Sequence, residues 1–256
     1  MMGFRVLLAK ELREQLRTGR IVAVAAVFVL FGILGPLTDR YMRELFDLIG
    51  SESGGLTIQL PPPSLAGALT QIIKNLSQFG VICALLLAMG SVAWEKERGT
   101  AGMIMTKPAS RAAFLAAKLV AISLNLGLAV TLGCGLAYVY TLILYPQAFP
   151  LGGYVAMAAM LWWSNVVFVA ITMLGSTLSR SAIAAAGLGL VALLVLGLLA
   201  AVPVIGPWSP LAMLTPATSL ALGEDAGNFA GPLLFNVALV PAIFVVTWVA
   251  FRHQEL

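Results

Sequence analysis

Four consecutive charged residues form the densest concentration of charge in this 256-residue sequence. Glu95, Lys96, Glu97 and Arg98 alternate in sign, and they stand between two long apolar segments. Side chains in this pattern can form ion pairs with one another or with a charged partner. The end of an apolar segment is therefore the most distinctive chemical feature of the chain.

The residues that follow contain the signals for a short helix. Gly99 is suited to ending the preceding helix, and Thr100 is a good N-cap for a second one. Lys107 and Pro108 would end this second helix, because the residue before a proline disfavours the helical conformation. Ser110 would then cap the next long apolar helix.

This short helix, over residues 101–107, would expose Met103, Ile104 and Met105. A short helix with an apolar tip and charged flanks is a feature that a soluble motor domain could grip. The alternative is an ordinary solvated loop between two long helices. Periodicity and charge alone do not separate these two interpretations.

The groups that an enzyme would need are missing from the sequence. His253 is the only histidine, which excludes a zinc-protease helix and a histidine-based triad. No Gly-Lys-Ser or Gly-Lys-Thr string is present for a phosphate-binding loop. No apolar segment has an acid or base at its middle, and Lys118 is close enough to one end to reach the interface. We expect no catalysis by this chain alone and no bound metal, and energy for transport would come from another chain.

Long apolar segments must position this charged group. Hydrophobic residues make up 60% of the sequence and charged residues 10%, with a mean hydropathy of +0.98, whereas soluble domains carry about a quarter charged residues. A helix of about 20 apolar residues crosses a bilayer. The sequence therefore predicts an all-α polytopic membrane protein with six transmembrane helices. The expected spans are residues 21–37, 75–94, 112–144, 153–178, 182–203 and 231–251.

Lysine and arginine are unequally divided between the two sides of this six-span arrangement. Of the 15 such residues, all but Arg40, Arg43 and Lys74 fall on the side that holds both ends of the chain. Basic residues favour the cytoplasmic side, so both termini are expected there. The net charge of +4 then reflects membrane orientation and does not indicate nucleic-acid binding.

The first 20 residues predict a separate amphipathic helix, followed by a six-span domain over residues 21–256. Phe4, Leu8, Leu12 and Leu16 recur every four residues, and basic residues occupy the other faces. This pattern is typical of a helix that lies on the inner membrane surface against anionic lipid headgroups. Gly19 would end it, and the first apolar segment would be an uncleaved span. The alternative is a cytosolic extension of that span.

Two outer loops and one span complete the prediction. In the loop over residues 38–74, residues 41–49 are expected to form a separate short helix. The loop over residues 204–230 is rich in proline but apolar, so we expect short broken helices that enter the outer leaflet or cap the bundle. Small residues recur in the fifth span, and they could pack within one subunit or across a dimer seam. They are Ala185, Gly189, Gly197 and Ala201.

The sequence resembles the permease subunits of type-2 ABC transporters over essentially its whole length. Residues 94–100, residues 107–111 and Lys118 match the acidic pair, Gly-Thr step, Pro-Ser-Arg-like turn and following lysine of that family's inner loop. Residues 10–12 of the basic leader and residues 176–181, between the fourth and fifth spans, match as well.

The resemblance implies a permease of a prokaryotic plasma membrane that pairs with a second copy, as a homodimer, and with two separate ABC ATPase subunits. It implies export along a pathway at the dimer interface, with ATP and Mg²⁺ bound by the ATPase and no cofactor bound by this chain. It also implies that the inner loop is a coupling helix that docks in a groove of the ATPase. The residues assigned to coupling are Glu95, Lys96, Glu97, Arg98, Gly99, Thr100, Lys107, Pro108, Ser110 and Arg111.

Two other functions are considered beside this one. A non-transporting membrane anchor or sensor could have the same permease-like fold. An intramembrane enzyme would need a nucleophile with a base, or a metal site, and the spans offer neither. Movement of a substrate that depends on nucleotide separates the transporter from the anchor.

Overall fold

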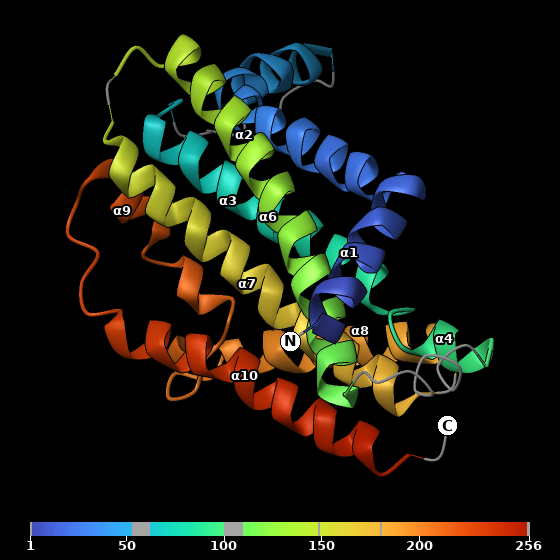
Figure 1. Cartoon of the computed structure of the whole chain (residues 1–256). Coiled ribbons are helices and arrows are strands. Elements are labelled where there is room, and N and C mark those ends of the chain that lie inside the picture. Colours follow the sequence, from blue (N-terminus) through green and yellow to red (C-terminus); the bar gives the residue numbers. More distant parts are fainter. Residues whose placement is uncertain (1, 53–61, 100–109, 148, 180, 255–256) are drawn as a thin grey trace.

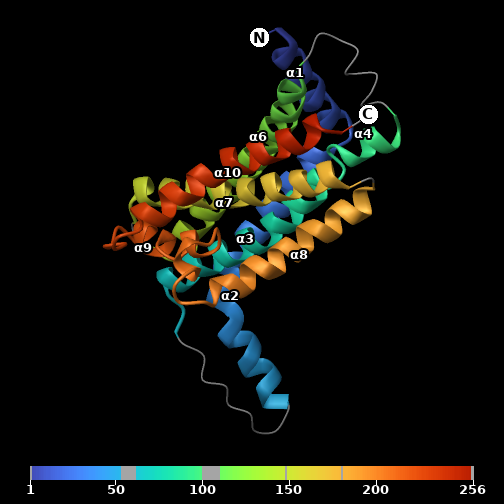
Figure 2. The same ribbon diagram turned by 90° about the horizontal axis from the view of Figure 1, so that it is seen from below.

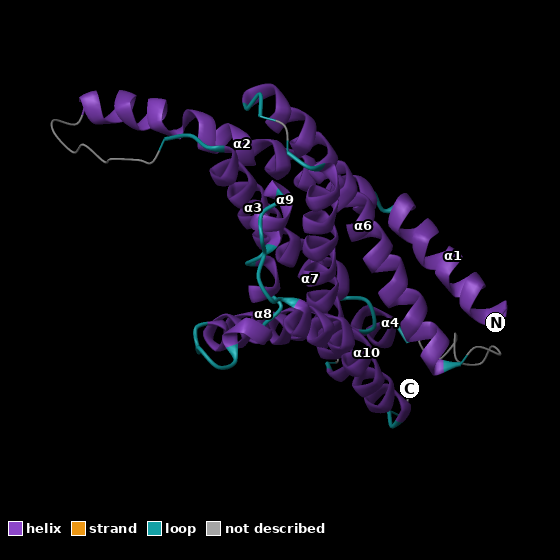
Figure 3. Cartoon of the chain, turned by 90° about the vertical axis from the view of Figure 1, so that its left-hand side faces the viewer, coloured by secondary structure: helices purple, strands orange, loops and turns teal. Residues whose placement is uncertain are grey.

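A computed structural model of the chain describes residues 2–52, 62–99, 110–147, 149–179 and 181–254. These residues form helices and connecting turns, and none of them lies in a β-strand, which confirms the all-α class (Figures 1 and 3). The helices are α1 (Met2–Arg17), α2 (Arg20–Glu52), α3 (Leu65–Ala88), α4 (Ala93–Glu97), α6 (Arg111–Leu144), α7 (Leu151–Leu178), α8 (Ala182–Ala200), α9 (Ala217–Leu222) and α10 (Ala230–Arg252), with 3-10 turns η1 (Gly206–Trp208) and η2 (Ala212–Leu214).

Six segments of the described chain are long and apolar enough to cross a membrane, as predicted. These segments are helical because a lipid-facing backbone must satisfy its hydrogen bonds within the segment, and the second of them comprises α3, a turn and α4. The spans over α6, α7, α8 and α10 begin within two residues of the predicted positions. The candidate spans are Arg20–Met42, Leu65–Glu97, Arg111–Leu144, Leu151–Leu178, Ala182–Ala200 and Ala230–Arg252.

The first two spans are longer than predicted. The helix α2 continues through Pro36 to Glu52, so the separate short helix predicted over residues 41–49 is wrong, and its residues extend the first span beyond the bundle (Figure 2). The helix α3 begins ten residues before the predicted start, at Leu65, where the Ser64 side chain accepts a hydrogen bond from the N–H of Gly67. The uncharged segment begins only after Lys74, but a helix tolerates an exposed lysine, so α3 starts before it.

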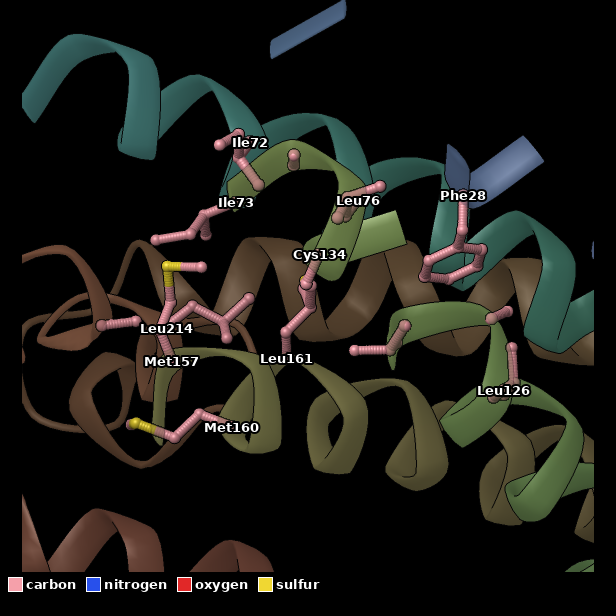
Figure 4. Packing of buried hydrophobic residues seen from close by; sticks show 14 of the residues in the cluster. Phe28, Ile72, Ile73, Leu76, Leu126, Cys134, Met157, Met160, Leu161 and Leu214 are labelled. Atoms are coloured by element: carbon pink, nitrogen blue, oxygen red, sulfur yellow. The ribbon is translucent and has the colours of Figure 1, made fainter. Parts of the chain in front are cut away.

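The helices α2 and α6 cross at very short range through glycine. A Cβ atom at Gly32 would lie 2.7 Å from the carbonyl oxygen of Gly133, and one at Gly133 would lie 2.7 Å from that of Phe28. Small residues let membrane helices approach closely. Phe28, Leu126 and the residues around them form the buried core between α2, α3, α6 and α7 (Figure 4).

The residues between α8 and α10 form short broken helices, as predicted. Their backbone carbonyls find partners within the protein: Ser164 donates to the carbonyl of Pro210 at 3.1 Å, and Asn236 donates to that of Trp208 at 3.2 Å. The helix α9 packs on the beginning of α7, where a Cβ atom at Gly153 would lie 1.9 Å from a carbonyl oxygen. This segment therefore covers one end of the bundle.

Both described ends of the chain lie at the other end of the bundle (Figures 1 and 2). The helices α1 and α4, the beginning of α6 and the last turn of α10 meet there, and we call this region the basic end. Gly19, with φ of 69°, separates α1 from α2, as predicted. A left-handed conformation costs little in glycine, so the chain turns there into the first span.

Candidate functional site

A group of two lysines and two glutamates, of which Lys118 is buried and Lys10 is exposed, joins three helices at the basic end. Lys118 of α6 has its Nζ atom 3.0 Å from Oε1 of Glu11 in α1 and 2.9 Å from Oε1 of Glu95 in α4. Lys10 of α1 has its Nζ atom 3.2 Å and 3.0 Å from the same two oxygens. We call these four residues the ion cluster, and its formal charge is zero.

Charge balance is what allows Lys118 to be buried. Lys118 is only 3% exposed, and an isolated ammonium group there would carry a large desolvation cost. Partial burial lowers the pKa of Lys10, but its hydrogen bond to Glu95 and the attraction of both carboxylates outweigh this effect and raise it. The Lys118 side chain does not extend into solvent, and the carboxylates of Glu11 and Glu95, from two other helices, balance its charge.

The helix α1 is fixed to α6 by contacts on either side of the ion cluster. Asn125 of α6 donates to the side-chain oxygen of Gln15 at 2.7 Å, and both residues are buried. Leu7 packs against a small apolar cluster that includes Phe114. Leu16 of the predicted apolar stripe is 61% exposed, so it does not take part in these contacts with α6. The face turned toward α6 is set by the polar pairing partners.

The end of α7 holds the turn between α3 and α4. Ser176 accepts hydrogen bonds from the N–H groups of Val92 at 3.1 Å and Ala93 at 3.0 Å, and it donates to the carbonyl of Met89 at 2.7 Å. Lys96 donates to two backbone carbonyls at the end of α7, those of Thr177 and Ser179. The orientation of α4 therefore depends on α7.

The beginning of α6 is joined to the end of α10. Arg111 donates through one guanidinium nitrogen to the carbonyl oxygens of Phe251 at 2.9 Å, Arg252 at 2.8 Å and Gln254 at 3.2 Å. A cation at a helix C-terminus satisfies carbonyls that lack partners and complements the helix dipole. Ser110 caps α6 by accepting from the N–H of Ala113 at 3.1 Å, as predicted.

Comparison with known proteins agrees with this architecture. Residues 5–255 match the sequence profile of the ABC-2 family transporter proteins. The chain belongs to the ABC-2 transporter family. It is also similar to the uncharacterized transmembrane protein YxlG of Bacillus subtilis (strain 168), with 28% identity over 257 residues, which cover 97% of each protein.

Membership of the ABC-2 family confirms the resemblance drawn from residues 94–100, residues 107–111 and Lys118. The chain is a multi-pass membrane protein and a component of a transporter, and proteins of this kind are not catalysts by themselves. Membership also implies an ABC ATPase as partner in general.

The predicted coupling residues of this ABC-2 protein differ in their surroundings. Glu95, Lys96, Ser110 and Arg111 make the contacts given above. Glu97, Arg98 and Gly99 are exposed at the end of α4, and Gly99 has φ of 68°, which agrees with its predicted role in ending a helix. The remaining predictions lie outside the described residues: they are Thr100, Lys107, Pro108 and the short helix over residues 101–107.

Lys10, Glu11, Lys118 and Ser176 belong to this site but are not among the predicted coupling residues. Glu11 and Lys118 were part of the matched sequence pattern, but their pairing across 107 positions has no local signal. Ser176 lies in residues 176–181, which match the family pattern but carry no predicted role in coupling. Lys118 and Ser176 in otherwise apolar helices are the available signal, because buried polar groups are paired.

Proposed function

We propose that this chain is the permease subunit of an ATP-driven exporter, that it forms the substrate pathway as a dimer, and that separate ABC ATPase subunits drive it from the basic end. The observation that carries this proposal is the ion cluster. Through Glu95, it links α4 to α1 and α6 beside the exposed residues Glu97 and Arg98.

This connectivity supports the assignment of residues 95–111 as the coupling segment. A force on its first residues reaches α1 and α6 through Glu95, and it reaches α7 through Lys96. A force on its last residue reaches α10 through Arg111. Because polar and ionic contacts in a low-dielectric region resist separation, such a force would move these helices together.

The orientation follows from the same region. Basic residues gather at the basic end, so we place this end and both termini in the cytoplasm of a prokaryotic cell, with α1 against the inner leaflet. ATP and Mg²⁺ would be bound by the ATPase. The exposed side chains of Glu97 and Arg98 form no ion pair with other described residues, so they are suited to a charged partner.

Purification of the tagged chain from native membranes tests this proposal. We expect a protein with the sequence of an ABC ATPase to co-purify, and Glu97→Arg to lower its amount because an attractive contact becomes repulsive. Glu224→Arg is the matched control, since Glu224 is an exposed acid at the opposite end. Equal retention of the ATPase by both variants would contradict the coupling role of residues 95–111. An anchor without transport activity would bind the ATPase but show no nucleotide-dependent substrate movement in vesicles.

A further inference from the structure

A cavity of about 580 Å³ lies beside the ion cluster, between α1, the beginning of α2, the end of α3, α4 and α6. We propose that this cavity binds the phosphate headgroup of a membrane phospholipid. The inference goes beyond transport and coupling, because binding would need neither an ATPase nor a substrate.

The lining of the cavity combines charged and apolar side chains. Lys10, Glu14 and Arg98 are exposed side chains on its wall, and the buried part of the lining includes the apolar side chains of Leu87 and Ile122. A ligand that fits this lining has a charged part and an apolar part. A phospholipid has both, and a free anion such as inorganic phosphate has only the first.

The charge of the lining favours an anion. Four basic and three acidic side chains contribute, so the net charge is +1. The ion cluster neutralises four of these seven groups, and Glu14 lies 3.9 Å from Lys10. Arg20 and Arg98 remain, and neither has an acidic partner among the described residues. Two arginines are well suited to phosphate, because the guanidinium group can donate two parallel hydrogen bonds.

Trp94 orders one of these arginines. The guanidinium carbon of Arg20 lies 5.3 Å from the centroid of the Trp94 ring, and the ring lies so close to Gly90 that a Cβ atom there would come within 2.4 Å of it. The ring is thus held between a glycine and a cation. This contact restrains the Arg20 side chain before a ligand binds, which lowers the entropy cost of binding.

The position of the cavity identifies the source of the phosphate. Its wall is α1, a basic helix with exposed apolar side chains such as Val6 and Leu16, which are 69% and 61% exposed. Such a helix lies at the level of lipid headgroups. The apolar residues of the cavity belong to spans, where lipid chains are found. A phospholipid therefore meets this cavity with its phosphate at the depth of Arg20.

Binding of dioctanoyl phosphatidylglycerol to the full chain in neutral detergent, measured by native mass spectrometry, tests the proposal. We expect one lipid to bind with a defined affinity, and Arg20→Gln and Arg98→Gln each to weaken it about tenfold, through loss of a charge-assisted hydrogen bond. Arg20→Lys, which keeps the charge, should lose less. Arg252→Gln is the matched control, because Arg252 also stacks on a tryptophan, Trp248, but lies outside the cavity.

Two further ligands separate the possible sources of binding. Dioctanoylglycerol, which lacks phosphate, and inorganic phosphate, which lacks acyl chains, should each bind far more weakly than the phospholipid. Equal binding of dioctanoylglycerol would overturn the headgroup site, and equal binding of inorganic phosphate would overturn the lipid. Equal weakening by Arg20→Gln and Arg252→Gln would also overturn it. If Arg20→Gln does not fold, as judged by size-exclusion elution, the exposed Arg98 carries the same test.

Discussion

Substitution of Lys118 by methionine tests the ion cluster most simply. Methionine keeps the length and most of the volume of the side chain but removes its charge. The cluster would then hold one ammonium group, that of Lys10, and two carboxylates, those of Glu11 and Glu95. We expect a less stable protein in which α1 separates more readily from α6.

The size of the effect follows from the geometry. Removing one partner of a buried ion pair costs about 3–5 kcal/mol. The cost is lower here because Lys10 stays 3.2 Å from Glu11 and 3.0 Å from Glu95, whose side chains are 13% and 16% exposed. We expect a loss of about 2 kcal/mol, which lowers Tm by about 4–8 °C in a chain of this length.

Thermal unfolding in detergent, followed by circular dichroism, measures this loss. Lys74→Met is the matched control, since Lys74 is an exposed lysine in another span helix, and its Tm should change little. The double variant Lys118→Met with Glu11→Gln restores the balance of charge, so its Tm should be higher than that of Lys118→Met alone. Equal Tm values for Lys118→Met and Lys74→Met, or a double variant less stable than the single one, would refute the reasoning.

Three other substitutions test separate parts of the structure by their effect on unfolding. Gly133→Val should lower the free energy of unfolding by about 2–3 kcal/mol, because the added Cβ atom meets the backbone of α2. Gly135→Val should lower it little, because a Cβ atom at Gly135 meets open space. Equal Tm values for the two variants would contradict the close crossing of α2 and α6. Ser176→Ala should lower the free energy of unfolding by about 2–3 kcal/mol, because the buried N–H groups of Val92 and Ala93 lose their partner. We expect increased proteolysis within α4 in the same variant. Burial and the hydrogen bond to Asp39 raise the pKa of Tyr145 above its usual 10.0, so the stability that the protonated Tyr145 contributes is complete below pH 10 and is lost as the pH rises. Tyr145→Phe removes this titration and should therefore lose less stability above pH 10 than the unsubstituted protein. An unchanged pH profile would argue against the contact.

The fold could be predicted from the sequence where the physical signal is local. Apolar segments long enough to cross a bilayer locate the spans, and Ser110 and Ser181 cap the helices that follow them. The predicted bounds of α2 and α3 are wrong, because Asp39 and Lys74 limit an uncharged segment without limiting a helix. The bilayer limits the apolar part of a helix but not its full length.

The candidate site could be predicted only in outline. The alternating charges near Glu95 show where polar contacts must form, but its partners Lys10 and Lys118 come from helices far away in the sequence. Which face of α1 is turned toward α6 depends on the buried pair Gln15 and Asn125, and the apolar period alone gives a different face. Pairing between helices is set by packing, which no local pattern encodes.

Site-specific photo-crosslinking in native membranes tests the central claim most directly. A photoreactive amino acid placed at Glu97, the exposed acid beside the ion cluster, should form a crosslink to a protein with the sequence of an ABC ATPase. The same group at Glu224, on the opposite end, should not. A crosslink to the ATPase from position 224, or none from position 97 while the ATPase co-purifies, would contradict the proposal that the basic end receives the force of the motor.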